Sequence, residues 1–465
     1  MRINKRLIIS SCFISVVLLG LVFLFYRKIS SPPDVILITV DALRADHLSG
    51  YGYPRKTSPN IDDFAKGGVT FLNCFATSSA TVSAIPGLMT GQYVTVQKFE
   101  PFWDNILDKR FTILAEYLKN FGFYTAAFLA NATLRKGRGF EQGFDYFYVK
   151  DGIGAKGLNT EVLHFLNRPS RNKPAFIWVH YMEPHSPYEF REEYFKKFGG
   201  DSLYKENDRM LQLKPDNVDV GQYFRESTSD GYIPPIVFHK DRYNLNYYIA
   251  CYDTEIVYVD LWIGRLLKGI KKNTIIILTA DHGEAMGEHN VYFNHGENIY
   301  DEVVHIPLII KDNRYFKGGK IISKAVSGVD IVPTILSRIN PAWYFLNKSK
   351  FNGIDLRLLA QNKNIQRKYI YSYFTWAWSI LDISKNIKYI LNRNKGGREE
   401  LYILPNEVKN LINDDSPEIV SVKNDLRQRL GLWRKAYPIF SDINTKKVTL
   451  DEDTKEDLRS LGYLQ

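Results

Sequence analysis

The sequence predicts an α/β protein built on a large, mostly parallel β-sheet, with a small α+β subdomain at its C-terminal end. Two observations predict this fold. Continuous apolar runs of strand length recur along the chain, and such runs are typical of parallel strands buried on both faces. Helical patterns separate several of these runs, as in repeated β-α-β units. The length of 465 residues suits one large α/β domain with an appendage.

The elements of the predicted sheet follow one another along most of the chain. Apolar runs predict strands at residues 35–40, 124–129, 175–179, 274–278 and 306–310. Helical patterns lie around residues 114–121 and over residues 243–267. Because ligands of such sheets collect beyond the carboxyl ends of the strands, the residues that directly follow each run are the first candidates for a functional site.

Composition divides the chain into three parts. Residues 1–33 are predicted to form a membrane anchor and linker, and residues 34–349 a catalytic domain. Within that domain, residues 189–242 are long, polar and irregular, which predicts an insertion or a lid. Residues 350–465 are predicted to form the C-terminal subdomain, with short strands at 369–374 and 387–391 and a closing helix at 419–432.

The N-terminal segment has the pattern of a transmembrane helix. Residues 7–26 carry no charge, and a helix of this length spans about 30 Å, the thickness of a bilayer core. A cleaved signal peptide is the alternative, but its apolar region would be shorter, and no small-residue cleavage site follows Phe25. The slightly larger positive charge before the span predicts a single-pass membrane protein whose catalytic domain lies outside the cytoplasm.

The net charge of +10 does not indicate nucleic-acid binding. Much of it is concentrated in the N-terminal segment, and no basic helix or basic–aromatic array of a nucleic-acid binder is present. Five basic residues precede the first acid, Asp34: Arg2, Lys5, Arg6, Arg27 and Lys28.

The three cysteines exclude a disulfide scaffold and a cysteine-built metal site. Cys12 lies in the apolar N-terminal run, so the one remaining pair is Cys74 with Cys251. Because most lone cysteines are small core residues, we expect these two as buried free thiols.

Three predicted strands end on residues that carry chemistry. Asp41 follows the first run, His180 and His185 follow the third, and Asp281 with His282 follows the fourth. A lone aspartate at a strand end is more often a helix cap. Two such carboxylates with an imidazole instead indicate a divalent metal site, suited to Mn, Zn, Mg or Ca.

Four motifs in order resemble the sulfatase family of the alkaline phosphatase superfamily, over about residues 34–345. They are DVILITVDALRADHLSGYGYPRKTSPNIDDFAKGGVTF, SSATVSAIPGLMTG, VHYMEPHSPY and TADHGEAMGEHNVYFNHGENIYDEVVHIPLII. The resemblance implies an alkaline-phosphatase-like α/β/α sandwich. It also implies that Asp41, Asp281 and His282 hold the catalytic metal.

The nucleophile position departs from the sulfatase pattern. Sulfatases carry C-x-P-x-R followed by Thr-Gly, and counting back from Thr90 places Thr81 at the nucleophile position, Ser83 at the proline and Ile85 at the arginine. A threonine cannot give the aldehyde that attacks sulfate, because its β-carbon carries a methyl group. Residues 81–86, TVSAIP, instead resemble the T-x-x-S-x-P stretch of phosphoethanolamine transferases, which like lipoteichoic acid synthases use a metal-bound threonine.

That resemblance implies a Thr81 hydroxyl that completes the metal shell and attacks a phosphodiester, giving a phospho-threonine. Ser79 and Ser83 are alternative nucleophiles, and a plain helix cap is the alternative role of Thr81.

The remaining candidates are assigned through the same resemblance. His185 and His295 match family histidines that bind the anionic group or protonate the leaving oxygen, a task suited to imidazole near pH 7. His180 and Arg44 are the candidate substrate-binding residues. Arg44 has a structural alternative, an ion pair with Asp46 or Asp281.

Three functions are therefore compared. The first is a metal-dependent hydrolase or phosphotransferase acting through Thr81 on phosphate esters or phosphodiesters. The second is a sulfuric ester hydrolase of the same fold, and the third is a non-catalytic binder of an anionic glycan or lipid. The expected partner is an anionic ester, whether glycan, lipid or small molecule, together with the membrane through the N-terminal helix.

Overall fold

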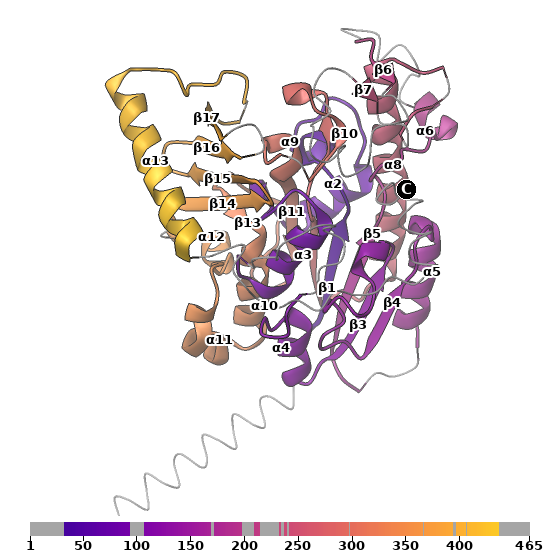
Figure 1. Ribbon diagram of the computed structural model, residues 1–465. Coiled ribbons are helices and arrows are strands. Elements are labelled where there is room, and N and C mark those ends of the chain that lie inside the picture. Colours follow the sequence, from indigo (N-terminus) through magenta and orange to yellow (C-terminus); the bar gives the residue numbers. More distant parts are fainter. Residues whose placement is uncertain are drawn as a thin grey trace, which may run out of the picture.

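The structure is a computed structural model (Figure 1). It describes residues 32–93, 107–168, 172–197, 209–213, 232–233, 237–239, 241–296, 298–365, 367–393, 397–405 and 407–436. The predicted membrane anchor at residues 7–26 lies outside these ranges. Within them, no helix combines the length and the apolar character needed to cross a bilayer.

Nine strands of the described chain form one large mixed sheet. The order is β12-β2-β11-β8-β1-β5-β3-β4, with β13 beside β2. Their bounds are β1 (Asp34–Val40), β2 (Val69–Phe75), β3 (Tyr124–Leu129), β4 (Tyr146–Val149), β5 (Ala175–Tyr181), β8 (Thr274–Ala280), β11 (His305–Lys311), β12 (Lys320–Ile322) and β13 (Val326–Ser327). Of these, β11 alone runs against its neighbours, β8 and β2.

Helices cover both faces of this sheet, which gives a three-layer α/β/α sandwich (Figure 1). One face carries α2 (Pro59–Lys66), α5 (Gly154–Leu166) and α8 (Leu245–Gly269). The other carries α3 (Thr81–Thr90), α4 (Leu114–Asn120) and α10 (Ile331–Ile339). The shorter helices are α6 (Glu192–Lys197), α9 (Asp301–Val304), α11 (Pro341–Asn347) and α12 (Arg357–Ala360).

The C-terminal part is an antiparallel sheet with one long helix against it. The strands are β14 (Tyr369–Phe374), β15 (Ala377–Asp382), β16 (Ile387–Asn392) and β17 (Arg398–Ile403), and the helix is α13 (Pro417–Ala436). Val422, Leu426, Leu430 and Trp433 of α13 are buried in an apolar cluster of their own with residues of this sheet. Two small pairs complete the strands: β9 (Ala285–Met286) with β10 (Tyr292–Asn294), and β6 (Gln212–Leu213) with β7 (Tyr232–Ile233).

The fold class predicted from the sequence is confirmed for the sandwich and the mostly parallel sheet. All five strands and both helical segments predicted for the main sheet are present, each within a few residues of its predicted bounds. Cys74 and Cys251 are buried free thiols, as expected. Of the predicted insertion, the described residues form only short elements, α6, β6 and β7.

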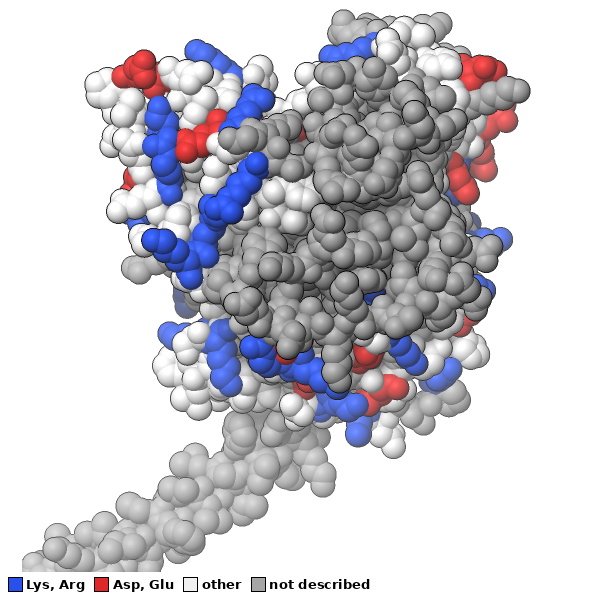
Figure 2. Space-filling view, viewed as in Figure 1, with Lys and Arg blue, Asp and Glu red and all other residues white. Residues whose placement is uncertain are grey.

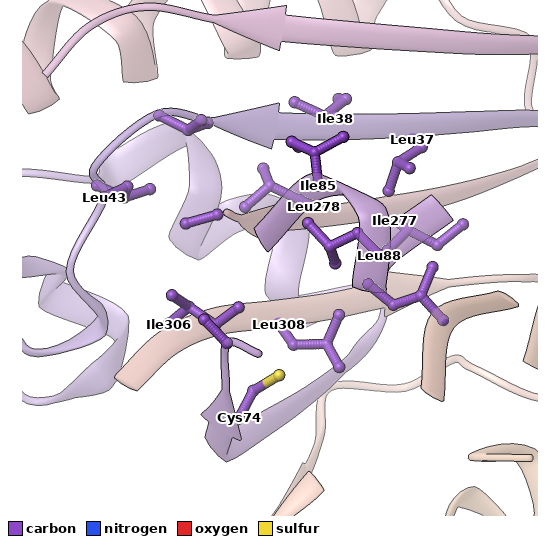
Figure 3. Packing of buried hydrophobic residues seen from close by; sticks show 14 of the residues in the cluster. Leu37, Ile38, Leu43, Cys74, Ile85, Leu88, Ile277, Leu278, Ile306 and Leu308 are labelled. Atoms are coloured by element: carbon purple, nitrogen blue, oxygen red, sulfur yellow. The ribbon is translucent and has the colours of Figure 1, made fainter. Parts of the chain in front are cut away.

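Apolar packing fixes helix α3 above the centre of the sheet (Figure 3). Ile85 and Leu88 of α3 lie against Leu37 and Ile38 of β1 and against Ile277 and Leu278 of β8. All are buried, and each buried side chain of this size contributes about 1.5–3 kcal/mol. The helix ends at Gly91, whose φ of 69° closes it in the left-handed conformation that favours glycine. This packing holds the first residue of α3, Thr81, near the carboxyl ends of β1 and β8.

Candidate active site

Two adjacent strands deliver the two carboxylates of the site. Strands β1 and β8 are parallel neighbours, and Val40 pairs in register with Ala280. The next residues, Asp41 and Asp281, therefore leave the sheet side by side, and His282 follows directly. This is the strand-end arrangement expected for ligand sites of α/β sheets.

Asp41, Asp281 and His282 form a cluster that could hold a metal ion. One ligand atom from each lies within 4.8 Å of the others, and all three side chains are fully buried. The Oδ2 atom of Asp281 has no hydrogen-bond partner. A buried carboxylate oxygen without a partner is costly unless a cation compensates it. Two carboxylates and an imidazole therefore fit a hard or borderline divalent ion.

The Thr81 hydroxyl lies against this cluster. Its Oγ1 is 3.2 Å from Nε2 of His282 and 3.3 Å and 3.4 Å from the two carboxylate oxygens of Asp41. The hydroxyl of Ser83 is engaged elsewhere, with the Ser78 hydroxyl and the Ala80 carbonyl. Ser79 Oγ is buried and has no hydrogen-bond partner. Of the three candidate nucleophiles, it is Thr81 whose hydroxyl contacts the cluster of Asp41, Asp281 and His282.

Asn131 also contacts the cluster, and the sequence did not single it out. It follows strand β3, and its Nδ2 donates a hydrogen bond of 2.6 Å to Oδ2 of Asp41. The backbone amide and the hydroxyl of Thr133 both donate to Oδ1 of Asn131, which orients the side-chain amide. The available signal was its position beyond a predicted strand, but an asparagine after an apolar run is also an ordinary turn residue.

His180 lies behind Asp41 on strand β5. Its Nε2 is 3.1 Å from Oδ2 of Asp41, and its Nδ1 is 2.8 Å from the Thr39 hydroxyl. The ring is fully buried. Burial alone would raise the pKa of Asp41, but His185, His180 and His282 lower it far below its ordinary value. The geometry therefore favours His180 as a support for the Asp41 carboxylate over its predicted substrate contact.

His185 and His295 lie together above the cluster. Their ring centroids are 4.7 Å apart, and the His295 ring stacks on His282 at 4.4 Å. Burial lowers the pKa of His185 to about 4. Burial also acts to lower the pKa of His295, but the Glu284 carboxylate, 3.2 Å from Nδ1, raises it overall. Two neighbouring imidazoles with opposite shifts suit one neutral and one protonated role.

Glu284 is a second residue that the sequence did not single out. It is fully buried, and His295 and then His185 keep its pKa below the ordinary value although burial acts to raise it. Its signal was the Asp-His-Gly-Glu run, in which only the first two residues were assigned.

Arg44 is held in place by two neighbouring carboxylates, those of Asp46 and Glu288. Its guanidinium binds Asp46 through two hydrogen bonds of 2.9 Å and 2.7 Å, lies 2.8 Å from Glu288 and donates to the Glu284 carbonyl. It does not pair with Asp281, and its side chain is nearly buried. Of the two predicted roles, this geometry favours the structural one.

The sequence is similar to that of known proteins over most of its length. A sulfatase family model matches residues 33–340 of the chain. The uncharacterized sulfatase YidJ of Escherichia coli (strain K12) is 24% identical over 357 residues, which are 66% of this chain and 67% of that protein. An arylsulfatase of Clostridium perfringens (strain 13 / Type A) is 24% identical over 452 residues, covering 82% of this chain and 91% of that protein.

Solved structures share the fold. A phosphonate monoester hydrolase of Agrobacterium radiobacter superposes with a TM-score of 0.66 at 20% identity, covering 87% of this chain and 96% of that chain. A protein in complex with its substrate D-glucosamine-2-N,6-O-disulfate superposes with a TM-score of 0.68 at 20% identity, covering 88% and 98%. At this identity the likeness concerns the fold alone.

Proposed function

Because this chain belongs to the sulfatase family, we propose that it is a metal-dependent hydrolase or transferase that attacks an anionic ester with the Thr81 hydroxyl. The observation that supports this proposal is the position of Thr81 Oγ1, 3.2 Å from His282 and 3.3 Å from Asp41. A nucleophile needs an activating neighbour, and the neighbour here is a buried cluster that fits a cation. A threonine that only capped a helix would not need this contact.

The proposed substrate is a phosphate ester or a phosphodiester. The β-carbon of threonine carries a methyl group, so Thr81 cannot become the aldehyde that sulfatases use. Phosphoryl transfer needs only a positioned hydroxyl and charge stabilisation. Thr81 also starts helix α3, and the positive end of a helix of ten residues favours an anion there.

The side chains of the site have separate tasks in this proposal. Asp41, Asp281 and His282 would hold the ion, supported by Asn131 and His180. A divalent ion there would lower the pKa of the Thr81 hydroxyl and offset the charge of the ester. Mn, Zn, Mg and Ca all remain candidates for this donor set. His295, whose pKa the Glu284 carboxylate raises, would donate a proton to the leaving oxygen. Water or an alcohol then releases the phosphoryl group from Thr81.

Hydrolysis of a sulfate ester is the second candidate function. The support for this candidate is that several relatives are named as sulfatases, among them an arylsulfatase and an N-acetylglucosamine-6-O-sulfatase of Bacteroides thetaiotaomicron. An anionic glycan is the substrate class that these names suggest. A purely non-catalytic binder fits less well, because binding an anion does not call for two buried carboxylates beside a hydroxyl.

We also propose that the protein is anchored in a membrane by residues 7–26, with the catalytic domain outside the cytoplasm. The support for this is the uncharged length of that segment and its basic flanks.

The test is a substrate panel on the purified full-length protein in detergent. Aryl phosphate, bis-aryl phosphate, aryl phosphonate and aryl sulfate are compared with each candidate metal and with chelator. The proposal expects chelator-sensitive turnover of a phosphorus ester, lost in Thr81→Ala and kept in Ser83→Ala, whose hydroxyl contacts Ser78 and Ala80 instead. Turnover restricted to aryl sulfate would favour the second candidate.

A further inference from the structure

The short helix α11 exposes apolar side chains beside lysines. Phe345 and Leu346 are 69% and 79% exposed. The Nζ atom of Lys348 lies 5.3 Å from the Phe345 ring, and that of Lys350 lies 5.6 Å from the Trp343 ring. Aromatic and aliphatic side chains interleaved with lysines are typical of protein segments that lie in a membrane interface.

The other side of α11 attaches this helix to the body of the protein. Trp343 packs on Tyr117 and Phe121 with ring centroids 5.2 Å and 5.4 Å away. Phe121 directly precedes the turn that leads into β3. The contacts of Trp343 with Tyr117 and Phe121 therefore fix α11 on the body of the protein, while Phe345 and Leu346 stay exposed.

This helix lies at the edge of the main sheet where β1, β3, β5 and β8 begin, which we call the amino edge. Tyr124, the first residue of β3, pairs with Ala175, the first residue of β5, and the Ala175 amide donates 2.7 Å to Asp34, the first residue of β1. Neighbouring strands are about 4.8 Å apart, and β5 lies between β1 and β3. The first residues of β1 and β3, Asp34 and Tyr124, therefore lie within about 10 Å of each other. Figure 1 shows α11 and α4 at the same lower end as the start of β1.

We propose that the amino edge and α11 form a surface that contacts an anionic lipid bilayer. The proposal rests on the membrane anchor proposed above. Residues 27–33 separate the predicted span from Asp34, and a linker of this length reaches at most about 25 Å. The anchor would therefore keep the start of β1, at the amino edge, within about 25 Å of the lipid headgroups.

The charge of this edge matches an anionic partner. Lys173 precedes β5, Lys271 and Lys272 precede β8, and all three are exposed. Figure 2 shows basic side chains along the lower rim of the molecule, with some acidic ones among them. Lysines near a surface of anionic lipids are attracted to it over about a Debye length.

This orientation has a consequence for the substrate. Asp41 and Asp281 follow the opposite ends of β1 and β8, and a strand of seven residues is about 23 Å long. The catalytic cluster then faces away from the bilayer. Such a site suits an ester on a soluble molecule or on a polymer that extends from the surface, and not a lipid headgroup of the same membrane.

The test measures the lipid contact of α11 in the full-length protein. Leu346→Cys is labelled with an environment-sensitive fluorophore in a Cys12→Ser background, since Cys74 and Cys251 are buried. Leu432→Cys on α13, 60% exposed, is the matched control. Both are reconstituted in vesicles of phosphatidylcholine with about one third phosphatidylglycerol, and in phosphatidylcholine alone.

The proposal expects blue-shifted emission at position 346, quenched by spin-labelled lipid, with little change at position 432. The difference in emission between positions 346 and 432 should become smaller in vesicles without phosphatidylglycerol. It should also become smaller in the double variant Lys348→Ala/Lys350→Ala. Equal emission and equal quenching at the two positions would overturn the proposal. If the protein does not float with vesicles, the membrane anchor is wrong, and the proposal that rests on it is overturned. The substrate panel described above would still test the function of Thr81.

Discussion

Nε2 of His282 lies 3.2 Å from the hydroxyl oxygen of Thr81, although 201 positions separate the two residues. His282 reaches this point from the end of β8, and Thr81 reaches it from the first turn of α3. The packing of Ile85 and Leu88 on the sheet sets the distance between them (Figure 3). A hydroxyl, two carboxylates and an imidazole are thereby gathered in one buried cluster.

Replacing Asp281 should remove the metal. Asp281→Asn exchanges an anionic ligand for a neutral one, and the cluster then keeps one carboxylate, that of Asp41. We expect most bound metal to be lost, as measured by elemental analysis after gel filtration. The control Asp63→Asn changes an exposed carboxylate that pairs with Lys66 and should keep the metal. Full metal content and full activity in Asp281→Asn would remove this residue from the site.

Asn131 should act as a positioning residue for Asp41. Asn131→Ala removes the 2.6 Å hydrogen bond to Oδ2 of Asp41 and leaves His180 as the remaining support of that oxygen. Losing such a partner typically costs about 10–100-fold in metal affinity or activity. Metal titration monitored by thermal shift, together with kcat, checks this, and Asn73→Ala, whose amide binds the Ser323 carbonyl, is the control. Unchanged metal affinity in Asn131→Ala would contradict the positioning role.

The buried ion pair of Arg367 and Asp330 should contribute more to the free energy of unfolding than a more exposed ion pair does. Two short contacts of 2.5 Å and 2.6 Å join them, and Asp330 also accepts the amides of Ser327 and Ile354. Arg367→Ala leaves a buried carboxylate without its cation, which costs about 3–5 kcal/mol. Arg427→Ala breaks a more exposed pair with Glu399 and should cost about 1 kcal/mol or less. Denaturant unfolding of both variants measures the difference, and equal losses would contradict it.

The sequence predicted the parts of the sheet that carry strong local signals. The five strands with apolar runs were found because burial on both faces leaves few polar positions. Strand β2 was missed, since its run VTFLNCF contains polar residues and has two partly exposed positions. The antiparallel direction of β11 is set by its neighbours β8 and β2 and has no signature in its own residues.

The candidate site was predictable where a residue type and a strand end coincide. Asp41, Asp281 and His282 met both conditions, and Thr81 was reached through the spacing to Thr90 and Gly91. Glu284 contacts His295 within one segment of the chain and was not assigned. Asn131 and the support that His180 gives to Asp41 depend on which strands are neighbours. That information lies in the strand order β8-β1-β5-β3, which no single segment contains.

The central claim is that Thr81 is the nucleophile, and trapping the covalent intermediate tests it most directly. The full-length enzyme is mixed with a phosphodiester substrate, quenched in acid during turnover and digested for mass spectrometry. Losing the nucleophile should cost several orders of magnitude in rate, about 5 kcal/mol or more, while Thr81→Ser should keep part of it. We predict a phosphoryl adduct on Thr81 that is absent from Thr81→Ala. An adduct on Ser79 or Ser83, or an active Thr81→Ala enzyme, would contradict the claim.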